Sequence, residues 1–324
     1  MTDNILLLSP AIATENRGDE IIMEAIQQEL NYIIDTHFTF TLPTHTSSFH
    51  WYQVLRNSSA LRTYSECKLK FACGSNLLIK DMLTHYPQWN INIFNYQPFK
   101  GTILVGVGAS AHEYTNWYTK LLYKKMLNPD YIHSVRDERT RKYVESLGLK
   151  ALNTGCATMW MLTSEFCKTI PTKKSSRVVF TLTPNSTHHS EDQLLIDTLV
   201  KNYQEINFWV QGRKDMEYLK TFTNINDINI VKPTLQDYTT LLKTSDLDYV
   251  GTRLHAGIYA MRHRHRSIII VVDERAREIN KSNNLVCLEY DKLSSELESL
   301  INSEFKTEIQ LDVDAIHTWK AQFT

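Results

Sequence analysis

One stretch of the chain decides its fold: residues 247–272 read L-D-Y-V-G-T-R-L-H-A-G-I-Y-A-M-R-H-R-H-R-S-I-I-I-V-V. A strand-like run, Leu247 to Val250, stops at Gly251, and a helical pattern begins at about Leu254. A second strand-like run follows from Ser267 to Val272. A strand, a helix and a further apolar strand are typical of a βαβ unit in a parallel sheet.

The turn of this unit presents Thr252, Arg253 and His255. Ligands of α/β sheets bind at the carboxyl ends of strands, where this turn lies. A guanidinium can hold a carboxylate or phosphate with two hydrogen bonds, and an imidazole titrates near neutral pH. The pattern therefore predicts anion binding and proton transfer in one loop. The alternative is structural: Arg253 pairs with a local carboxylate and His255 packs as an ordinary helix residue.

The rest of the chain repeats the alternation of strands and helices in two halves. The first half is predicted to contain strands at 5–8, 38–42, 69–73, 102–107 and 131–135, with helices from Asp19 and at 49–61, 117–126 and 138–147. In the second half we expect strands at 177–182, 207–211, 228–231, 247–250, 267–272 and 285–288, with helices at 192–202, 215–221, 235–243, 254–262 and 275–281. Such alternation predicts mostly parallel, doubly wound sheets.

The segment Thr163 to Ser176 breaks this pattern with Thr, Lys, Pro and Ser, and it is the predicted linker. The expected domains are residues 1–165 and 176–310. Residues 311–324 contain a last helical pattern, Val313 to Phe323, which we expect to pack back on the first domain. Two Rossmann-type domains that face each other leave a cleft, the usual place for a small-molecule site.

Composition narrows the class of protein. Of 324 residues, 42% are apolar and 22% are charged, as in globular proteins, and the net charge of -1 argues against nucleic acid as a partner. The amino terminus lacks a secretory signal and no apolar run approaches the roughly 18 residues of a membrane span, so a cytoplasmic location is expected. Five cysteines without C-x-x-C spacing favour reduced thiols over disulfides or zinc, and no metal is expected.

Cofactor motifs are missing from the sequence. No segment matches G-x-G-x-x-G or G-x-x-x-x-G-K-[ST], and Gly106-Val107-Gly108 is only a fragment of the first. Nicotinamide and P-loop chemistry are therefore disfavoured.

Five polar motifs stand in a fixed order along the chain, and four of them follow predicted strands. They are N-R-G-D at 16–19, S-V-R-D-E at 134–138, T-G-C-A-T at 154–158, G-T-R-L-H-A at 251–256 and D-E-R-A-R-E-I at 273–279. Their order and spacing resemble the polysaccharide pyruvyl transferase family, from about residue 5 to about residue 290.

The resemblance implies a GT-B-like fold, with two Rossmann-type domains facing across a cleft, and phosphoenolpyruvate as co-substrate without a further cofactor. It also implies transfer of the enolpyruvyl carbon onto two hydroxyls of a sugar in a surface polysaccharide, such as an exopolysaccharide or capsule, or in its precursor. The product is a cyclic ketal, and phosphate is released. The acceptor is either free or lipid-linked, and a lipid-linked acceptor would bring the protein to the inner face of the membrane as a peripheral protein.

The chemistry of phosphoenolpyruvate assigns expected roles to the motif residues. Its carboxylate and phosphate need arginines, so Arg136, Arg253 and Arg275, with Thr252, are the predicted donor-binding residues. Proton transfer assigns His255 as the acid/base, with Arg253 and Asp19 completing the predicted catalytic set. The predicted acceptor-binding residues are Asn16, Asp19 and His112.

Two further charged segments have structural interpretations. Asp137 is expected to cap the following helix or to brace an arginine. The basic run Arg262 to Arg266 resembles an anion patch, but it follows a helix whose carboxyl end favours cations, so we interpret it as a solvated helix end.

Two other functions fit the same fold. One is a GT-B glycosyltransferase that uses a sugar nucleotide, which needs a pocket for the base and a carboxylate base. The other is a non-catalytic carbohydrate-binding or assembly partner, which has no need for an imidazole beside a guanidinium.

Overall fold

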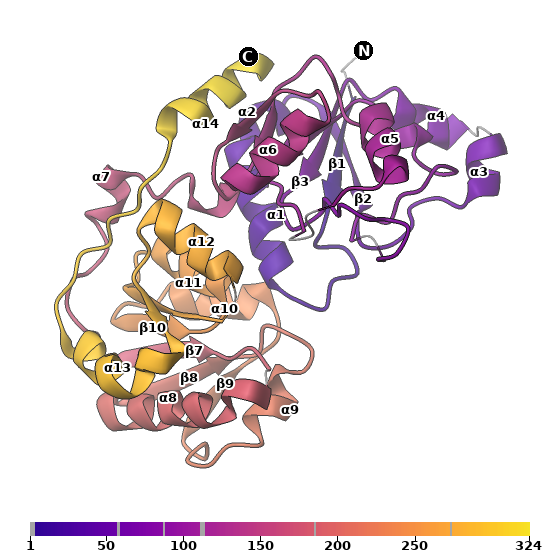
Figure 1. Ribbon diagram of the computed structural model, residues 1–324. Helices are drawn as coiled ribbons and strands as arrows, with labels where there is room; N and C mark the ends of the chain where they lie inside the picture. The colour runs from indigo at the N-terminus through magenta and orange to yellow at the C-terminus, as the bar shows by residue number, and fades with distance from the viewer. Residues whose placement is uncertain (1–3, 57–58, 87, 111–113, 185, 273) are drawn as a thin grey trace. The chain divides into compact units, whose positions relative to one another are not determined.

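The protein forms two compact units, each built from more than one stretch of chain (Figure 1). The computed structural model describes residues 4–324 except 57–58, 87, 111–113, 185 and 273. Unit 1 consists of Met1–Thr14, Ile22–Trp160 and Asp312–Thr324, and unit 2 consists of Glu15–Ile21 and Met161–Leu311. The short segments 15–21 and 312–324 each group with a unit that is distant in sequence.

Unit 1 is built on a parallel sheet in the order β2-β1-β3-β4. Its strands are β1 (Asn4–Ser9), β2 (Phe38–Pro43), β3 (Leu69–Cys73) and β4 (Thr102–Val105). A parallel pair, β5 (His133–Val135) and β6 (Ala151–Asn153), continues from β4 through a bridge between Val107 and Val135. Ile5 to Leu8 are fully buried, as expected for a strand covered on both faces.

Most helices of unit 1 come from the stretch of chain that carries its strands, and the last comes from the end of the chain. They are α2 (Asn31–Ile34), α3 (Trp51–Arg56), α4 (Ser59–Ser65), α5 (Trp117–Met126), α6 (Glu138–Ser146) and α14 (Val313–Lys320), together with most of α1 (Gly18–Glu29). The helix predicted at 49–61 overlaps α3 and α4, which ends at Ser65, and residues 57–58 between these two helices lie outside the described residues. The strand predicted at 102–107 ends at Val105, since Gly106 turns the chain with a φ of 60°.

Unit 2 contains a six-stranded parallel sheet in the order β12-β11-β10-β7-β8-β9. Its strands are β7 (Arg177–Thr181), β8 (Glu205–Trp209), β9 (Ile228–Val231), β10 (Leu247–Gly251), β11 (Ser267–Val271) and β12 (Cys287–Glu289). The chain starts at the central β7, winds outward to β9, and returns to β10 on the other side of β7. The strand order therefore reverses between β7 and β10, which is the topological switch point of a doubly wound sheet.

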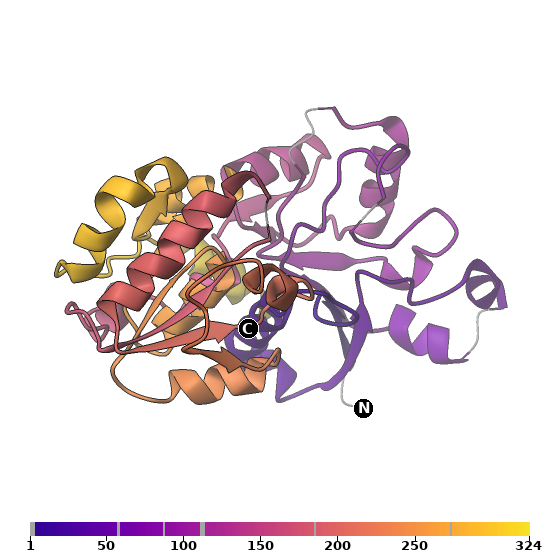
Figure 2. The same ribbon diagram turned by 90° about the horizontal axis from the view of Figure 1, so that it is seen from below.

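Helices cover both faces of the unit 2 sheet (Figures 1 and 2). On one face, α8 (His189–Asn202) and α13 (Leu293–Asn302) pack on Phe180 and Phe208. The other face carries α10 (Leu235–Leu242), α11 (Leu254–Arg262) and α12 (Glu274–Asn283), and here Trp209 stacks on Tyr238 with ring centroids 3.9 Å apart. The remaining helices are α7 (Ser164–Cys167), in the predicted linker, and α9 (Asp215–Leu219).

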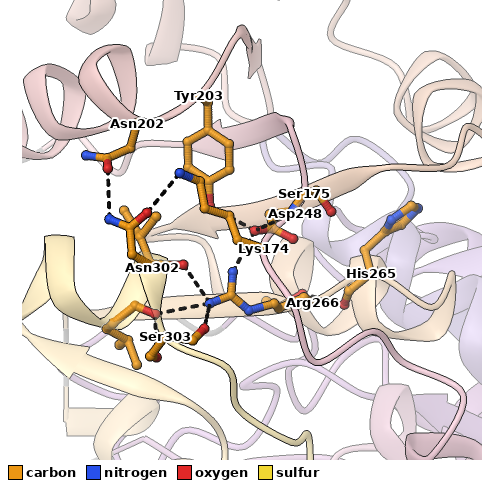
Figure 3. A network of polar contacts seen from close by, with 12 residues as sticks. Lys174, Ser175, Asn202, Tyr203, Asp248, His265, Arg266, Asn302 and Ser303 are labelled. Atoms are coloured by element: carbon orange, nitrogen blue, oxygen red, sulfur yellow. Dashed lines mark hydrogen bonds and ion pairs between the residues drawn. The ribbon is translucent and has the colours of Figure 1, made fainter.

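The basic run Arg262 to Arg266 is not a solvated helix end. Arg266 is 1% exposed and pairs with the equally buried Asp248 at 2.7 Å, and its other guanidinium nitrogen donates to three carbonyls at the end of α13 (Figure 3). Arg262 and His265 are also buried, and only Arg264 is exposed. The run is therefore mostly part of the core. The prediction was wrong because Asp248, which neutralises Arg266, lies on a different element, β10.

Two further observations concern membrane-spanning helices and the cysteines. In the part of the chain that the structure describes, no helix combines the length and hydrophobicity needed to cross a bilayer. The five cysteines form no disulfide, and four of them are buried.

Candidate functional site

The switch point of unit 2 brings the G-T-R-L-H-A motif against the end of β7. A Cβ on Gly251 would lie 2.7 Å from both the backbone nitrogen and the backbone oxygen of Thr181, so only glycine lets the two strand ends approach this closely. Thr252, which is 2% exposed, donates its backbone N–H to Thr181 O at 3.0 Å. Its hydroxyl donates to the Thr183 hydroxyl at 3.0 Å, so the predicted donor-binding Thr252 also fastens the turn.

Arg253 directly precedes α11, and its guanidinium is held on two sides. Nε donates to Leu182 O at 3.1 Å, and Nη2 forms an ion pair with Asp215, whose side chain is fully buried. The Arg253 side chain keeps 16% exposure. The structural alternative for Arg253, a local carboxylate partner, is thus realised, while the side chain as a whole is still partly exposed.

Asp215 begins α9 and organises the loop after β8. Its Oδ2 accepts the backbone N–H groups of Gln211 at 3.1 Å and Gly212 at 2.7 Å. Burial raises the pKa of Asp215, and the charge of Arg253 and these hydrogen bonds oppose that rise. A Cβ on Gly212 would lie 2.6 Å from Arg253 Nη2, so glycine at this position makes room for the ion pair.

The N-R-G-D motif meets the same loop. Asn16 Oδ1 accepts from Gln211 Nε2 at 2.7 Å, and the backbone N–H of Arg17 donates to Gln211 O at 3.0 Å. His255, 9% exposed, approaches from the first turn of α11: a Cβ on Gly18 would lie 3.5 Å from its Nδ1. Asn16, Gly18, Gln211 and His255 therefore form one polar cluster in unit 2.

Asp19 follows this cluster at the start of α1. It is 9% exposed, and its backbone N–H donates to Asn16 O at 3.1 Å. We had expected Asn16 and Asp19 to belong to the other domain from Arg253, but residues 15–21 belong to unit 2. The expectation failed because the motif follows β1 in sequence, whereas its hydrogen bonds join it to the loop after β8.

Arg136 belongs to unit 1, at the end of β5. It is 6% exposed and packs against Gly108, where any Cβ would overlap its guanidinium. Its side chain donates to Asn76 Oδ1 and, at 3.4 Å, to Asp137. Asp137 Oδ1 accepts the backbone N–H of Thr140 at 2.7 Å, which confirms the predicted cap of α6.

Two neighbouring motifs of unit 1 are joined by hydroxyl groups. Ser134 Oγ accepts the backbone N–H of Gly106 at 2.8 Å and lies 2.6 Å from Thr154 Oγ1. The S-V-R-D-E and T-G-C-A-T motifs thus support the turn on which Arg136 rests.

Two predicted site residues cannot be placed. His112 lies outside the described residues, and Arg275 lies on α12 in a stretch whose side chains the structure does not describe. Among the described residues, no three His, Cys, Asp or Glu side chains are grouped as a metal site would require.

The sequence interpretation missed Gln211 and Asp215. Both belong to the turn Q-G-R-K-D after β8, at the same carboxyl edge of the sheet as Arg253. The strand-end rule that singled out four other turns also applies to this one, and it is the signal that identifies them.

A comparison with known protein families shows which family the chain belongs to. The profile of the polysaccharide pyruvyl transferase family matches residues 16–274, which is most of the chain. The chain belongs to this family. The match contains the motifs with Asn16, Arg136 and Arg253, and it ends just before Arg275. No curated protein matches the sequence.

Solved structures show the fold of this family member. The UDP-GlcNAc 2-epimerase from Methanocaldococcus jannaschii, in complex with UDP-GlcNAc and UDP, is 10% identical with a TM-score of 0.54, and the match covers 100% of this chain and 99% of that one. MnaA from S. aureus, in a co-structure with UDP, is 10% identical with a TM-score of 0.52, covering 98% and 90%. The epimerase from Rickettsia bellii is 10% identical with a TM-score of 0.53, covering 100% and 95%. The fold is therefore GT-B-like, α/β with two Rossmann-type units.

Proposed function

We propose that the protein transfers the enolpyruvyl group of phosphoenolpyruvate onto two hydroxyls of one sugar, in a surface polysaccharide or its precursor, and releases phosphate. The observation that carries this proposal is the turn at the switch point of unit 2. It holds the partly exposed side chain of Arg253 one residue before a helix that begins Leu254-His255. Family membership supports the class of reaction.

Arg253 suits a dianionic or trianionic donor. Its guanidinium is already fixed by Leu182 and Asp215, so binding an anion orders no long side chain. The amino end of α11 adds the positive end of a helix dipole. Arg136 is the second arginine that we assign to the donor, and Thr252 and Arg275 complete the proposed donor set.

The reaction needs one proton delivered and two removed. In the first step a sugar hydroxyl adds to C2 of phosphoenolpyruvate, its proton leaves, and a proton joins C3 to form a methyl group. In the second step the other hydroxyl attacks C2, loses its proton, and phosphate departs. We assign the proton transfers to His255, and the placing of the diol to Asn16, Asp19 and His112.

The proposed setting follows from this chemistry. Phosphoenolpyruvate is a co-substrate, the reaction uses no further cofactor or metal, and arginines neutralise the leaving phosphate. The acceptor is a free or lipid-linked saccharide. We place the reaction in the cytoplasm, at the inner face of the membrane if the acceptor is lipid-linked.

A second candidate is a glycosyltransferase that uses a sugar nucleotide. The observation in its favour is that solved structures with this fold are described in complex with UDP or UDP-GlcNAc. It predicts binding of a nucleotide base, which the pyruvyl transfer does not need.

Ligand binding separates the two candidates. Phosphoenolpyruvate at 100 times its dissociation constant should stabilise the native protein by about 2.7 kcal/mol, whereas sugar nucleotides should not. Arg253→Ala should abolish the stabilisation by phosphoenolpyruvate. Arg264→Ala changes an exposed arginine just after α11; this variant is the matched control and should keep the stabilisation. Stabilisation by a sugar nucleotide alone would favour the glycosyltransferase.

A further inference from the structure

The backbone of Gln211 is anchored on both sides, and its side chain ends in an amide. It lies two residues after β8 and is 3% exposed. Its backbone N–H donates to Asp215 Oδ2, and its carbonyl accepts from the N–H of Arg17. Only the end of the side chain is left to make further contacts.

The hydrogen bonds of Asn16 distinguish the oxygen from the nitrogen of this amide. The backbone N–H of Gly18 donates to one terminal atom of the Asn16 side chain at 3.0 Å. A backbone N–H can only donate, so this atom is the oxygen, Oδ1. Gln211 reaches the same oxygen at 2.7 Å and must present its nitrogen to it. The Gln211 oxygen is therefore the other terminal atom.

That oxygen, Gln211 Oε1, is buried and accepts no hydrogen bond from the residues that the structure describes. A buried amide oxygen without a donor costs about 1–3 kcal/mol, and native proteins leave few of them. A donor supplied by a ligand would recover this cost. The oxygen is held within the cluster of the proposed acid/base, because a Cβ on Gly18 would lie 3.0 Å from Gln211 Nε2 and 3.5 Å from His255 Nδ1.

The geometry points to Gln211 as a residue that recognises the acceptor: Oε1 accepts a hydrogen bond from a hydroxyl of the saccharide beside His255. This inference rests on the proposed function. At neutral pH phosphoenolpyruvate is mostly the trianion, whose carboxylate and phosphate offer only acceptor oxygens, so this form does not satisfy a carbonyl oxygen. A sugar hydroxyl can, and Gln211 therefore selects the acceptor and not the donor.

Two substitutions test this assignment. Gln211→Met keeps the length of the side chain and removes both polar atoms, and it should raise the KM for the saccharide on the order of tenfold. The affinity for phosphoenolpyruvate should stay within about twofold, since no contact to the donor is lost. Gln211→Glu keeps an acceptor oxygen and should retain more of the saccharide affinity than Gln211→Met.

Deoxy analogues of the saccharide identify the hydroxyl. For the wild type, one analogue should bind weaker by a similar factor, because the buried oxygen then lacks its donor. For Gln211→Met the same analogue should bind as the parent sugar does. Equal losses in both proteins would overturn the inference.

Asn207→Leu, on the strand β8 that precedes Gln211, is the matched control. Its buried amide donates to Val178 O of β7 at 3.2 Å from the middle of β8, and its loss should lower stability without changing the KM for the saccharide. An unchanged saccharide KM in folded Gln211→Met, checked by its thermal midpoint, would also overturn the inference.

Saccharide binding without phosphoenolpyruvate separates this inference from the proposed function. If the wild type binds a saccharide and Gln211→Met binds it more weakly, Gln211 is a saccharide ligand even if no phosphate is released. If phosphate is released and saccharide binding is equal in both proteins, the inference alone fails. If the wild type binds no saccharide, both fail.

Discussion

Arg253 and Asp215 show how one residue pair prepares the proposed donor site. Asp215 is fully buried, whereas the Arg253 side chain is 16% exposed. Removing one member of a buried pair costs about 3–5 kcal/mol, because the other charge is left unpaired. The pair therefore holds the guanidinium in place before any anion binds, and the exposed part of Arg253 remains the surface that a ligand can reach.

The individual site residues differ in how far the sequence predicts them. Arg253 and His255 could be singled out because they follow a strand and a glycine within a few residues, and such patterns are local. The contact between Asn16 and Gln211 joins positions 195 residues apart, and no local pattern encodes it. The position of Asp215 after β8 could be singled out by the strand-end rule, but its pairing with Arg253, which lies on another element, has no local pattern.

Asp192 gives a prediction about pH. It is fully buried, and burial raises its pKa to about 6, although the hydroxyls of Tyr218 and Tyr290 donate to it. The ordinary pKa is about 3.9, so the fold favours the protonated form. This stabilisation is present below about pH 4 and is lost as the pH rises through 6.

Asp192→Asn, which cannot ionise, should therefore gain stability over the wild type as the pH rises. The two proteins should differ most above pH 6, by about 2–3 kcal/mol relative to their difference near pH 4. Urea unfolding between pH 4 and pH 8 measures this. A difference in the free energy of unfolding that stays constant with pH would contradict the account.

At the scale of elements, Arg266 links β10, β11 and α13. Its guanidinium pairs with Asp248 of β10, and it donates to Leu300 O, Ile301 O and Ser303 O at 2.8 to 3.0 Å (Figure 3). These carbonyls lie at the end of α13, where a helix leaves its last acceptors unsatisfied. The ring of Phe305 lies 4.2 Å from the guanidinium carbon.

Arg266→Met should lower the free energy of unfolding by about 3–5 kcal/mol, because it leaves Asp248 buried without its cation. Hydrogen exchange at the end of α13 should rise as well. Arg264→Met, two residues away and exposed, should change stability by less than about 0.5 kcal/mol. Equal effects of the two substitutions would rule out this role of Arg266.

Most elements could be predicted from periodicity. The helices predicted at 117–126 and 254–262 have those bounds in the structure, because their apolar residues and their ends agree. The helix α13 was missed, although Leu293, Leu297 and Ile301 are buried at helical spacing. The strand β6, Ala151–Asn153, is too short for an alternating pattern to appear.

At the scale of the whole molecule, the local sequence pattern does not tell which of the two units a segment joins. Unit 1 includes the last residues, 312–324, and unit 2 includes residues 15–21. Hydrophobic periodicity predicts that a segment is a helix, but it does not tell which core the helix joins. The two Rossmann-type sheets could thus be predicted from the sequence, whereas the grouping of residues 15–21 with Arg253 could not.

Trp319 of α14 should be a major contributor to the stability of unit 1. It is fully buried, donates from Nε1 to Ile132 O at 2.8 Å, and packs edge-on against Phe71 of β3. Trp319→Ala should cost about 3–5 kcal/mol in thermal or chemical unfolding. Val313→Ala on the same helix, 41% exposed, should cost much less. A small effect of Trp319→Ala would mean that α14 is dispensable for unit 1.

The central claim is pyruvyl transfer at the switch point of unit 2, and phosphate release from phosphoenolpyruvate tests it most directly. Wild type, His255→Ala and the control His263→Ala, just beyond the far end of α11, should be compared with a panel of free and lipid-linked saccharides that carry two free hydroxyls on one sugar. The account predicts acceptor-dependent release by wild type and His263→Ala, and a loss of at least about 100-fold in kcat for His255→Ala. Release that is unchanged in His255→Ala, or no release with any acceptor, would contradict it.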